Sequence, residues 1–318
     1  MTKKILKDSR TTAVLAILTV TGIWGLAGPV IVWTLRLIPP FTFLFLRFLI
    51  ASIVILPFTL KARFWREITR QNFPTLLGLS LLGTTFGLAI LFYGYQFTTA
   101  LDGSLIALLA PLMIITGGAI FLKEKVTKRE KIGLAVAFAG SIVTLAQPLL
   151  ERGAGGEKAA LGNALVLLYA VSWATYALWN KRIGKKFSTM TMTAVPIFIS
   201  VFVFAPLAFY EFSRFPASRF NLQASLPGIA YMSILSYIVA YYLYDWSVRL
   251  YDWSVRKIEV SEAALYGYLQ PLFAFPAAYF LSPWRGPDAL LFVRGNPNRS
   301  RRLLDGVQRS PRIQTKVM

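Results

Sequence analysis

Long apolar stretches separated by short polar gaps run along most of the chain. A helix needs about 20 mostly apolar residues to cross roughly 30 Å of hydrocarbon, so stretches of this length are typical of membrane spans. Nine windows are candidate helices: residues 12–34, 39–60, 74–95, 103–122, 132–149, 159–179, 190–210, 226–248 and 261–281. The pattern predicts an all-α membrane protein, built as a multi-pass helical bundle.

The number of basic residues in the gaps between these windows alternates. Lys and Arg are frequent in residues 1–11, 61–70, 123–131 and 181–186, and they are sparse or absent in the gaps between those segments. In multi-pass proteins, the loops rich in Lys and Arg face the cytoplasm. The alternation predicts a cytoplasmic N-terminus.

The two halves of the chain resemble each other. Pro111 aligns with Pro271 at an offset of 160 residues, and Trp24 aligns with Trp173 at an offset of 149. Five crossings separate the first window from the sixth, so the matched halves have opposite orientations. This arrangement is the inverted repeat of secondary transporters. We predict a first repeat in the part of the chain that covers residues 1–150 and a second in residues 159–281.

The second half also differs from the first in length. The heptad LYDWSVR occurs at 243–249 and again at 250–256, which accounts for seven of the 11 residues by which the two offsets differ. After residue 281 the longest apolar run is 289–293, far short of a crossing. We hypothesise that the tenth helix is absent because a shifted reading frame or an assembly error replaced it with the basic tail, 282–318, and that the tandem heptad is a similar accident.

The amino-acid composition limits the kinds of site and partner that the protein can have. Hydrophobic residues make up 56% of the chain and its mean hydropathy is +0.56. There is no Cys and no His, which excludes disulfides, thiolate chemistry, the usual zinc sites and a histidine general base. The net charge of +20 lies mostly between the spans, so we expect no nucleic-acid partner. No metal and no cofactor is expected.

Five motifs together carry a family resemblance. They are IWG at 23–25, FLRFLIAS at 45–52, FYGYQFTTALDGSLIALLAPL at 92–112, LKEKVTKREKIGLAVAFAGS at 122–141 and SEAALYGYLQPLFA at 261–274. Over about residues 10–281 the chain resembles the EamA family of the drug/metabolite transporter (DMT) superfamily, ten-helix bacterial permeases made of two five-helix repeats. The departures are the repeated heptad and the missing tenth helix.

The resemblance implies a function. Family members typically export amino acids, other metabolites or drugs, often with presumed proton coupling, from a central cavity lined by both repeats. We therefore expect a permease of the bacterial inner membrane that works by alternating access and effects efflux of a small-molecule substrate. It would lie in a lipid bilayer, alone or as a homodimer. The alternatives are an intramembrane enzyme, which no catalytic cluster supports, and a nonfunctional truncated or frameshifted permease.

Arg47 lies within the second window, with Phe43, Phe45 and Phe48 around it. A cation inside a membrane is costly, so it is a functional candidate by default. Arg47 either contacts substrate or acts in gating, or its side chain extends toward the headgroups.

Aromatic residues supply most other candidates for substrate binding. Tyr237, Tyr241 and Asp245 share a helix face, which lines either a polar cavity or a packed contact. Trp24, Trp173 and Tyr176 either stack on a ligand or pack the bundle. The full set of predicted substrate-binding residues is Trp24, Arg47, Tyr93, Trp173, Tyr176, Tyr237, Tyr241, Tyr266 and Gln270.

Two prolines and three carboxylates complete the predictions. Pro111 and Pro271 are expected to mark helix breaks with a gating role, because proline interrupts helical hydrogen bonding near many transporter sites. Asp102 and Glu262 are equivalent positions that either carry protons or stabilise helix N-termini, and we favour the second interpretation. Glu124 is the match to a turn motif of the family.

Overall fold

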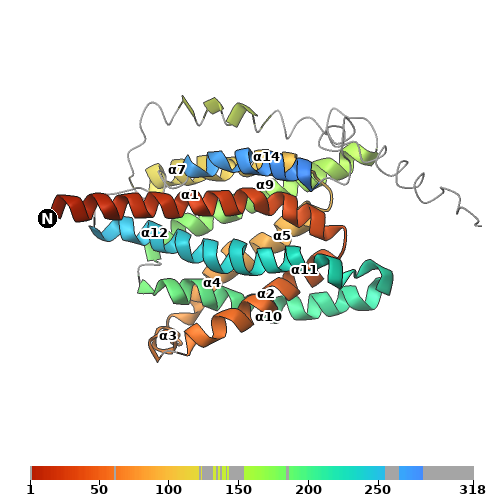
Figure 1. Cartoon of the computed structure of the whole chain (residues 1–318), viewed down its shortest axis with the longest axis horizontal. Helices are drawn as coiled ribbons and strands as arrows, with labels where there is room; N and C mark the ends of the chain where they lie inside the picture. The colour runs from red at the N-terminus through yellow and green to blue at the C-terminus, as the bar shows by residue number, and fades with distance from the viewer. Residues whose placement is uncertain are drawn as a thin grey trace, which may run out of the picture.

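The computed structural model describes residues 2–60, 62–121, 123, 132–133, 135–136, 138–140, 142, 154–183, 186–254 and 265–281. In this part of the chain every regular element is a helix, and the long helices lie side by side in a bundle (Figure 1). The helices of the first half are α1 (Thr2–Leu35), α2 (Pro40–Thr59), α3 (Ala62–Glu67), α4 (Phe73–Ser80), the π-helix η1 (Leu81–Thr85), α5 (Phe86–Gly94), α6 (Ala100–Ala107) and α7 (Leu109–Phe121). Those of the second half are α9 (Ala154–Ile183), α10 (Thr189–Arg214), the short η3 (Ala217–Arg219), α11 (Leu222–Ala230), the π-helix η4 (Tyr231–Val239), α12 (Ala240–Ser254), the 3₁₀-helix η5 (Tyr266–Leu269) and α14 (Gln270–Phe280).

Seven helical segments of the described residues are long and apolar enough to cross a membrane. They are Thr11–Leu35, Pro40–Thr59, Phe73–Gly94, Ala100–Phe121, Gly156–Ile183, Thr189–Arg214 and Ala217–Ser247. Each overlaps one of the predicted windows, so the prediction of an all-α multi-pass bundle is confirmed. The fifth window lies mostly outside the described residues, and the ninth is described only from residue 265, as η5 and α14.

Many large apolar side chains face outward on these helices. Phe202, Phe209 and Phe280 each expose more than 70% of their surface, at 79%, 74% and 81%. A water-soluble monomer rarely exposes apolar surface on this scale, because contact with water is unfavourable. In a bilayer the same side chains contact acyl chains, so the exposed faces are lipid-facing.

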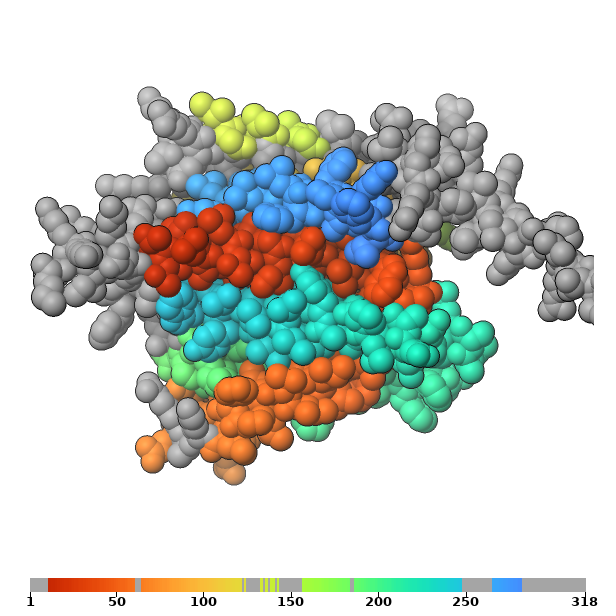
Figure 2. Space-filling model, in the orientation of Figure 1, coloured from red at the N-terminus to blue at the C-terminus, as the bar shows by residue number. Residues whose placement is uncertain are grey.

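The helix contacts repeat when the two halves are exchanged. In the first half α1 packs on α12 and α14 of the second, and in the second half α9 packs on α5 and α7 of the first. Figure 2 shows α14, α1 and α12 as neighbouring bands on one face. In Figure 1, α1 and α9 run in opposite directions. This exchange supports the predicted inverted repeat.

Two hydrogen bonds between helices join equivalent positions of the two halves. The hydroxyl of Tyr231 donates to the carbonyl oxygen of Ile23 at 2.7 Å, and that of Ser172 donates to the carbonyl oxygen of Leu82 at 2.6 Å. Ile23 corresponds to Ser172, and Leu82 to Tyr231, at the offset of 149 that aligns Trp24 with Trp173. The structure therefore contains the same connection twice, with the donor on opposite partners.

A carboxylate from each half satisfies the start of a helix in the other. Both oxygens of Glu211, near the end of α10, accept hydrogen bonds at the start of α2, from the backbone N–H of Phe41 at 3.1 Å and of Thr42 at 2.7 Å. Conversely, Glu67 at the end of α3 accepts from the N–H of Ser188 at 2.7 Å, just before α10. Carboxylates stabilise helix N-termini because the first N–H groups lack partners within the helix and the helix dipole is positive there.

Both helices that contain a predicted break are interrupted immediately before the proline. In the fourth span α6 ends at Ala107 and α7 begins at Leu109, two residues before Pro111. In the ninth, the 3₁₀ turn η5 gives way to α14 at Gln270, just before Pro271. The two interruptions meet, because a Cβ added to Gly267 would lie 3.1 Å from Cγ of Pro111. Their role in gating stays a prediction.

Several predictions fall outside the described residues. These are the turn at Glu124, the carboxylate of Glu262 and the basic tail 282–318. Of the tandem heptad, α12 continues through the first copy and into the second as far as Ser254.

Candidate functional site

A cavity lies in the middle of the bundle, between helices of both halves. The first half contributes residues of α1, α2, α5, α6 and α7, and the second contributes residues of α9, η4, α12, η5 and α14. The volume of the cavity, counted as the space open to the centre of a water molecule, is about 140 Å³. A single water needs roughly 10–15 Å³ by the same measure, so the cavity has room for a small organic molecule.

Four aromatic rings form one wall of this cavity. Trp24 of α1 meets Trp173 of α9 edge to face, with ring centroids 5.3 Å apart and planes at 88°. Tyr241 and Tyr244 of α12 contact both indoles at 5.5–5.7 Å. Because aromatic pairs prefer this geometry, each ring fixes the orientation of its neighbours. The wall therefore joins the two halves through contacts between rings.

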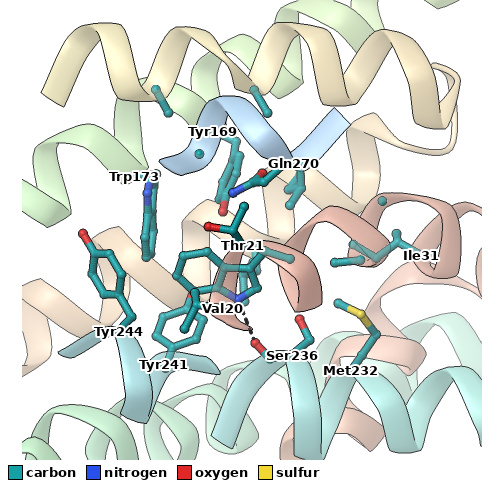
Figure 3. Close-up of a pocket in the computed structure, with 18 of the residues that line it drawn as sticks. Val20, Thr21, Ile31, Tyr169, Trp173, Met232, Ser236, Tyr241, Tyr244 and Gln270 are labelled. Atoms are coloured by element: carbon teal, nitrogen blue, oxygen red, sulfur yellow. Dashed lines mark hydrogen bonds between the residues drawn. The ribbon is translucent and has the colours of Figure 1, made fainter. Parts of the chain in front are cut away.

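Polar groups interrupt the apolar lining at a few points. The indole Nε1–H of Trp24 donates to the carbonyl oxygen of Ser236 at 3.0 Å, the dashed line in Figure 3. The side chains of Thr21, Gln270 and Tyr169 surround the same space from α1, α14 and α9 (Figure 3). Such a lining, mostly apolar with a few placed polar groups, is typical of small-molecule sites.

Arg47 brings a positive charge to the cavity from α2. Its side chain is only 1% exposed, and its guanidinium carbon lies over the rings of Phe48, Phe92 and Tyr237 at 5.1, 5.3 and 5.6 Å. Its Nε and Nη1 have no hydrogen-bond partner within the described structure. The side chain thus lies in the interior of the bundle and not at its outer ends.

The structure brings six of the predicted site residues together. Around the cavity lie Trp24, Arg47, Pro111, Trp173, Tyr241 and Gln270. Tyr237 and Tyr176 lie one layer behind: Tyr237 stacks on Tyr241 at 4.3 Å, and Tyr176 packs on Trp173 at 5.2 Å. Neither of these two side chains lines the cavity, and each packs against a ring that does.

The remaining predicted residues lie elsewhere. Tyr93 does not line the cavity; its ring is 41% exposed and stacks on Phe41 at 6.4 Å. Tyr266 and Pro271 flank the lining residues Gly267 and Gln270 without being part of the lining.

The described carboxylates are used structurally. Asp102 accepts a hydrogen bond from the Thr99 hydroxyl at 2.8 Å, while its own N–H donates to Thr99 at 3.0 Å, which confirms the helix-capping interpretation. Asp245 is buried next to Asn180, whose amide lies 3.3 Å from it, and it does not line the cavity. Among the described residues no group of three or more acidic side chains could hold a metal ion.

Sequence reasoning missed five lining residues with polar side chains, Thr21, Tyr95, Tyr169, Ser236 and Tyr244. Helical spacing could have found three of them, because Thr21 precedes Trp24 by three residues, Tyr169 precedes Trp173 by four and Tyr244 follows Tyr241 by three. Ser236 gave no such signal, since its contribution includes a backbone carbonyl.

Comparison with known proteins gives a consistent result. The EamA-like transporter family matches two segments of this chain, residues 11–146 and 160–283. An uncharacterized transporter of Archaeoglobus fulgidus is 24% identical over 246 residues, which cover 77% of this chain and 81% of that protein. The uncharacterized transporter YvbV of Bacillus subtilis is 27% identical over 275 residues, covering 86% of this chain and 85% of that one.

Two further similarities extend this picture. The uncharacterized transporter YetK of Bacillus subtilis is 30% identical over 65% of this chain and 62% of its own length. A solved crystal structure shares the fold, with a TM-score of 0.58 at 19% identity, over 93% of this chain and 98% of that one.

Proposed function

Because the chain belongs to the EamA-like transporter family, as its two matched segments show, we propose that it is a secondary transporter that moves its substrate by alternating access. It is a multi-pass membrane transporter, and a lipid bilayer surrounds it. The proposal adds that the cavity described above holds the substrate. It further adds export as the direction, the bacterial inner membrane as the location and a cytoplasmic N-terminus. Proton coupling and assembly as a homodimer stay predictions.

The observation that carries the proposal is the composition of the cavity wall. Its residues come from both halves of the chain, and Trp24 and Trp173, equivalent positions of the two halves, touch across it. In transporters built from inverted repeats, the site lies between the repeats, and one repeat rocks against the other around it. A cavity walled by one half alone would not change its access in this way.

The two π-helices support the same mechanism. The start of η4 at Tyr231 corresponds to Leu82, the second residue of η1, at the offset of 149. Each segment therefore sits at the same place in the third helix of its half, next to one of the two connecting hydrogen bonds. Because π-helical turns frequently mark functional sites and bends in helices, we propose these two segments as the hinges.

Cysteine labelling tests alternating access directly, because the chain has no cysteine of its own. Thr21→Cys on α1 and Ser236→Cys on η4 each place a single thiol in the cavity. A membrane-impermeant maleimide is applied to right-side-out and inside-out vesicles. We expect both thiols to react from each side, with substrate changing the ratio of the two rates.

Leu44→Cys serves as the control, because Leu44 is fully buried in the core and does not line the cavity. Its thiol should react from neither side. Labelling of the cavity thiols from one side only, under every condition, would contradict alternating access. A second experiment tests the substrate site itself, by measuring uptake and efflux of a panel of substrates in variants with alanine in place of Arg47, Tyr241 or Gln270. If flux is unchanged in all three variants, the cavity is not the substrate site.

A further inference from the structure

Arg47 is a buried cation whose charge is unbalanced in the described structure. No acidic side chain is among the residues that line the cavity. The titratable groups that face its guanidinium are Tyr237, Tyr241 and Tyr169, all of which are neutral phenols at physiological pH. Burying a charge without an opposite charge is strongly unfavourable, so this arrangement needs a compensating interaction.

Part of the compensation comes from the aromatic rings. Phe48, Phe92 and Tyr237 present their faces to the guanidinium within 5.6 Å. Ring faces attract cations electrostatically, but they accept no conventional hydrogen bond from Nε and Nη1, which stay without partners. A guanidinium is a planar fork in which Nη2 pairs with Nε on one edge and with Nη1 on the other, and each edge matches the two oxygens of a carboxylate.

The other residues that line the cavity indicate which chemical groups the rest of such a ligand would carry. Trp24, Trp173 and Tyr244 offer aromatic surface of low polarity. Because the described lining residues include no carboxylate, the cavity offers a ligand ammonium group no opposite charge.

From these features we propose that the cavity takes an aromatic monocarboxylate that has no ammonium group, with its carboxylate on one forked edge of the Arg47 guanidinium. This deepens the proposed function and rests on it, since it specifies the substrate class of the same cavity. The anion supplies the charge that Arg47 lacks, and the rings stack along the aromatic wall.

Four probes that share one carbon skeleton test the proposal on the full chain in lipid nanodiscs. They are 3-phenylpropionate, 3-phenylpropionamide, 3-phenylpropylamine and phenylalanine. Affinity is measured by titration calorimetry, and quenching of tryptophan fluorescence reports contact with Trp24 and Trp173. Because a charge-assisted bidentate pair is about twice as strong as a neutral hydrogen bond, we expect 3-phenylpropionate to bind at least about 10-fold more tightly than its amide.

Variants of Arg47 test whether this side chain causes the preference for the acid over the amide. Arg47→Met should remove the preference for acid over amide, and Arg47→Lys should reduce it without removing it, because charge persists while the fork is lost. Arg214→Met is the matched control: Arg214 also lies over an aromatic ring, that of Tyr210 at 5.4 Å, but is exposed and away from the cavity. It should leave all four affinities unchanged.

A second measurement separates a ligand role from a structural one. Replacing a buried unpaired cation by an apolar side chain of similar length should raise the melting temperature of the ligand-free protein while acid binding is lost. A lower melting temperature together with intact acid preference would overturn the proposal.

Other results would also overturn it. These are equal affinity of wild type for acid and amide, tighter binding of phenylalanine than of 3-phenylpropionate, or no binding of any probe at millimolar concentration. The acid and amide comparison needs no variant, so it decides even where Arg47→Met does not fold. Cysteine labelling from both sides combined with any of these results would retain the proposed transport function and reject only the substrate class.

Discussion

Helix α2 of the first half and helix α10 of the second pack against each other, yet only α2 brings a cation to the cavity. At the offset of 149, Arg47 corresponds to Pro196, which is buried within α10. Tyr95 and Tyr244, in contrast, are identical at equivalent positions, and both line the cavity.

The difference teaches which parts of the bundle need symmetry. The connections between helices, Tyr231 to Ile23 and Ser172 to Leu82, recur in both halves. The proposed alternating access would use this recurrence, since equivalent contacts would form and break on each side. In the proposed mechanism the ligand occupies the central cavity, which a single Arg47 lines. Charge can therefore be supplied by one half alone.

The largest expected effect concerns the two carboxylates that cap helices of the opposite half, Glu211 and Glu67. Glu211→Ala removes the acceptor for three donors at the start of α2, including the Thr42 hydroxyl at 2.9 Å. The residue before α2 is Pro39, which provides no side-chain cap. We expect a loss of about 3 kcal/mol in the free energy of unfolding, measured by steric trapping in bicelles.

Glu67→Ala is the matched change in the other half. Its effect should be smaller, about 1 kcal/mol, because α10 retains its own cap, the Ser188 side chain that accepts from the Thr191 N–H. Equal losses in the two variants would show that the two caps are equivalent and would contradict this expectation.

The next largest effect concerns the contact of α1 with α14. A Cβ at Gly25 would lie 2.7 Å from the carbonyl oxygen of Gln270 and 2.8 Å from Cβ of Phe273, so α14 would have to move. Gly25→Ala should destabilise the protein by about 2 kcal/mol, despite the better helix propensity of alanine. Thermal unfolding in detergent micelles measures this.

The equivalent residue of the second half, Ala174, already carries a Cβ, so the second half tolerates what the first does not. Ala174→Gly is the control and should cost only about 1 kcal/mol through backbone entropy. A Gly25→Ala variant as stable as wild type would show that α14 adjusts freely.

The smallest expected effect tests whether the two hydrogen bonds between helices contribute equally to stability. Tyr231→Phe and Ser172→Ala each remove one hydrogen bond between helices and should each cost about 1 kcal/mol. Unfolding free energies of both variants and of the double variant measure this. If one loss is several-fold larger than the other, the two connections are not equivalent.

Much of the fold could be predicted because its signals are local. Length and hydropathy of each window indicated the membrane spans, and Pro111 and Pro271 indicated where two helices are interrupted. The capping role of Asp102 could also be predicted, because Thr99 precedes it by three residues.

The site could be predicted only in part. Trp24 and Trp173 were found because they stand at equivalent positions, but Tyr93 was included although its ring faces outward. Glu211 gave no signal, since its partners Phe41 and Thr42 lie about 170 residues away in sequence. Distances of this kind depend on how helices pack, which periodicity does not encode.

The sequence by itself determined that the chain crosses a membrane repeatedly, and it predicted two related halves, because hydrophobicity over a helix length and the recurrence of residues are properties of sequence alone. Only the tertiary structure decided that Arg47 lies inside the bundle, surrounded by Phe48, Phe92 and Tyr237, with two nitrogens unpartnered beside the cavity. The physical reason is that the cost of a buried charge depends on what other helices place around it, and those helices come from distant parts of the chain.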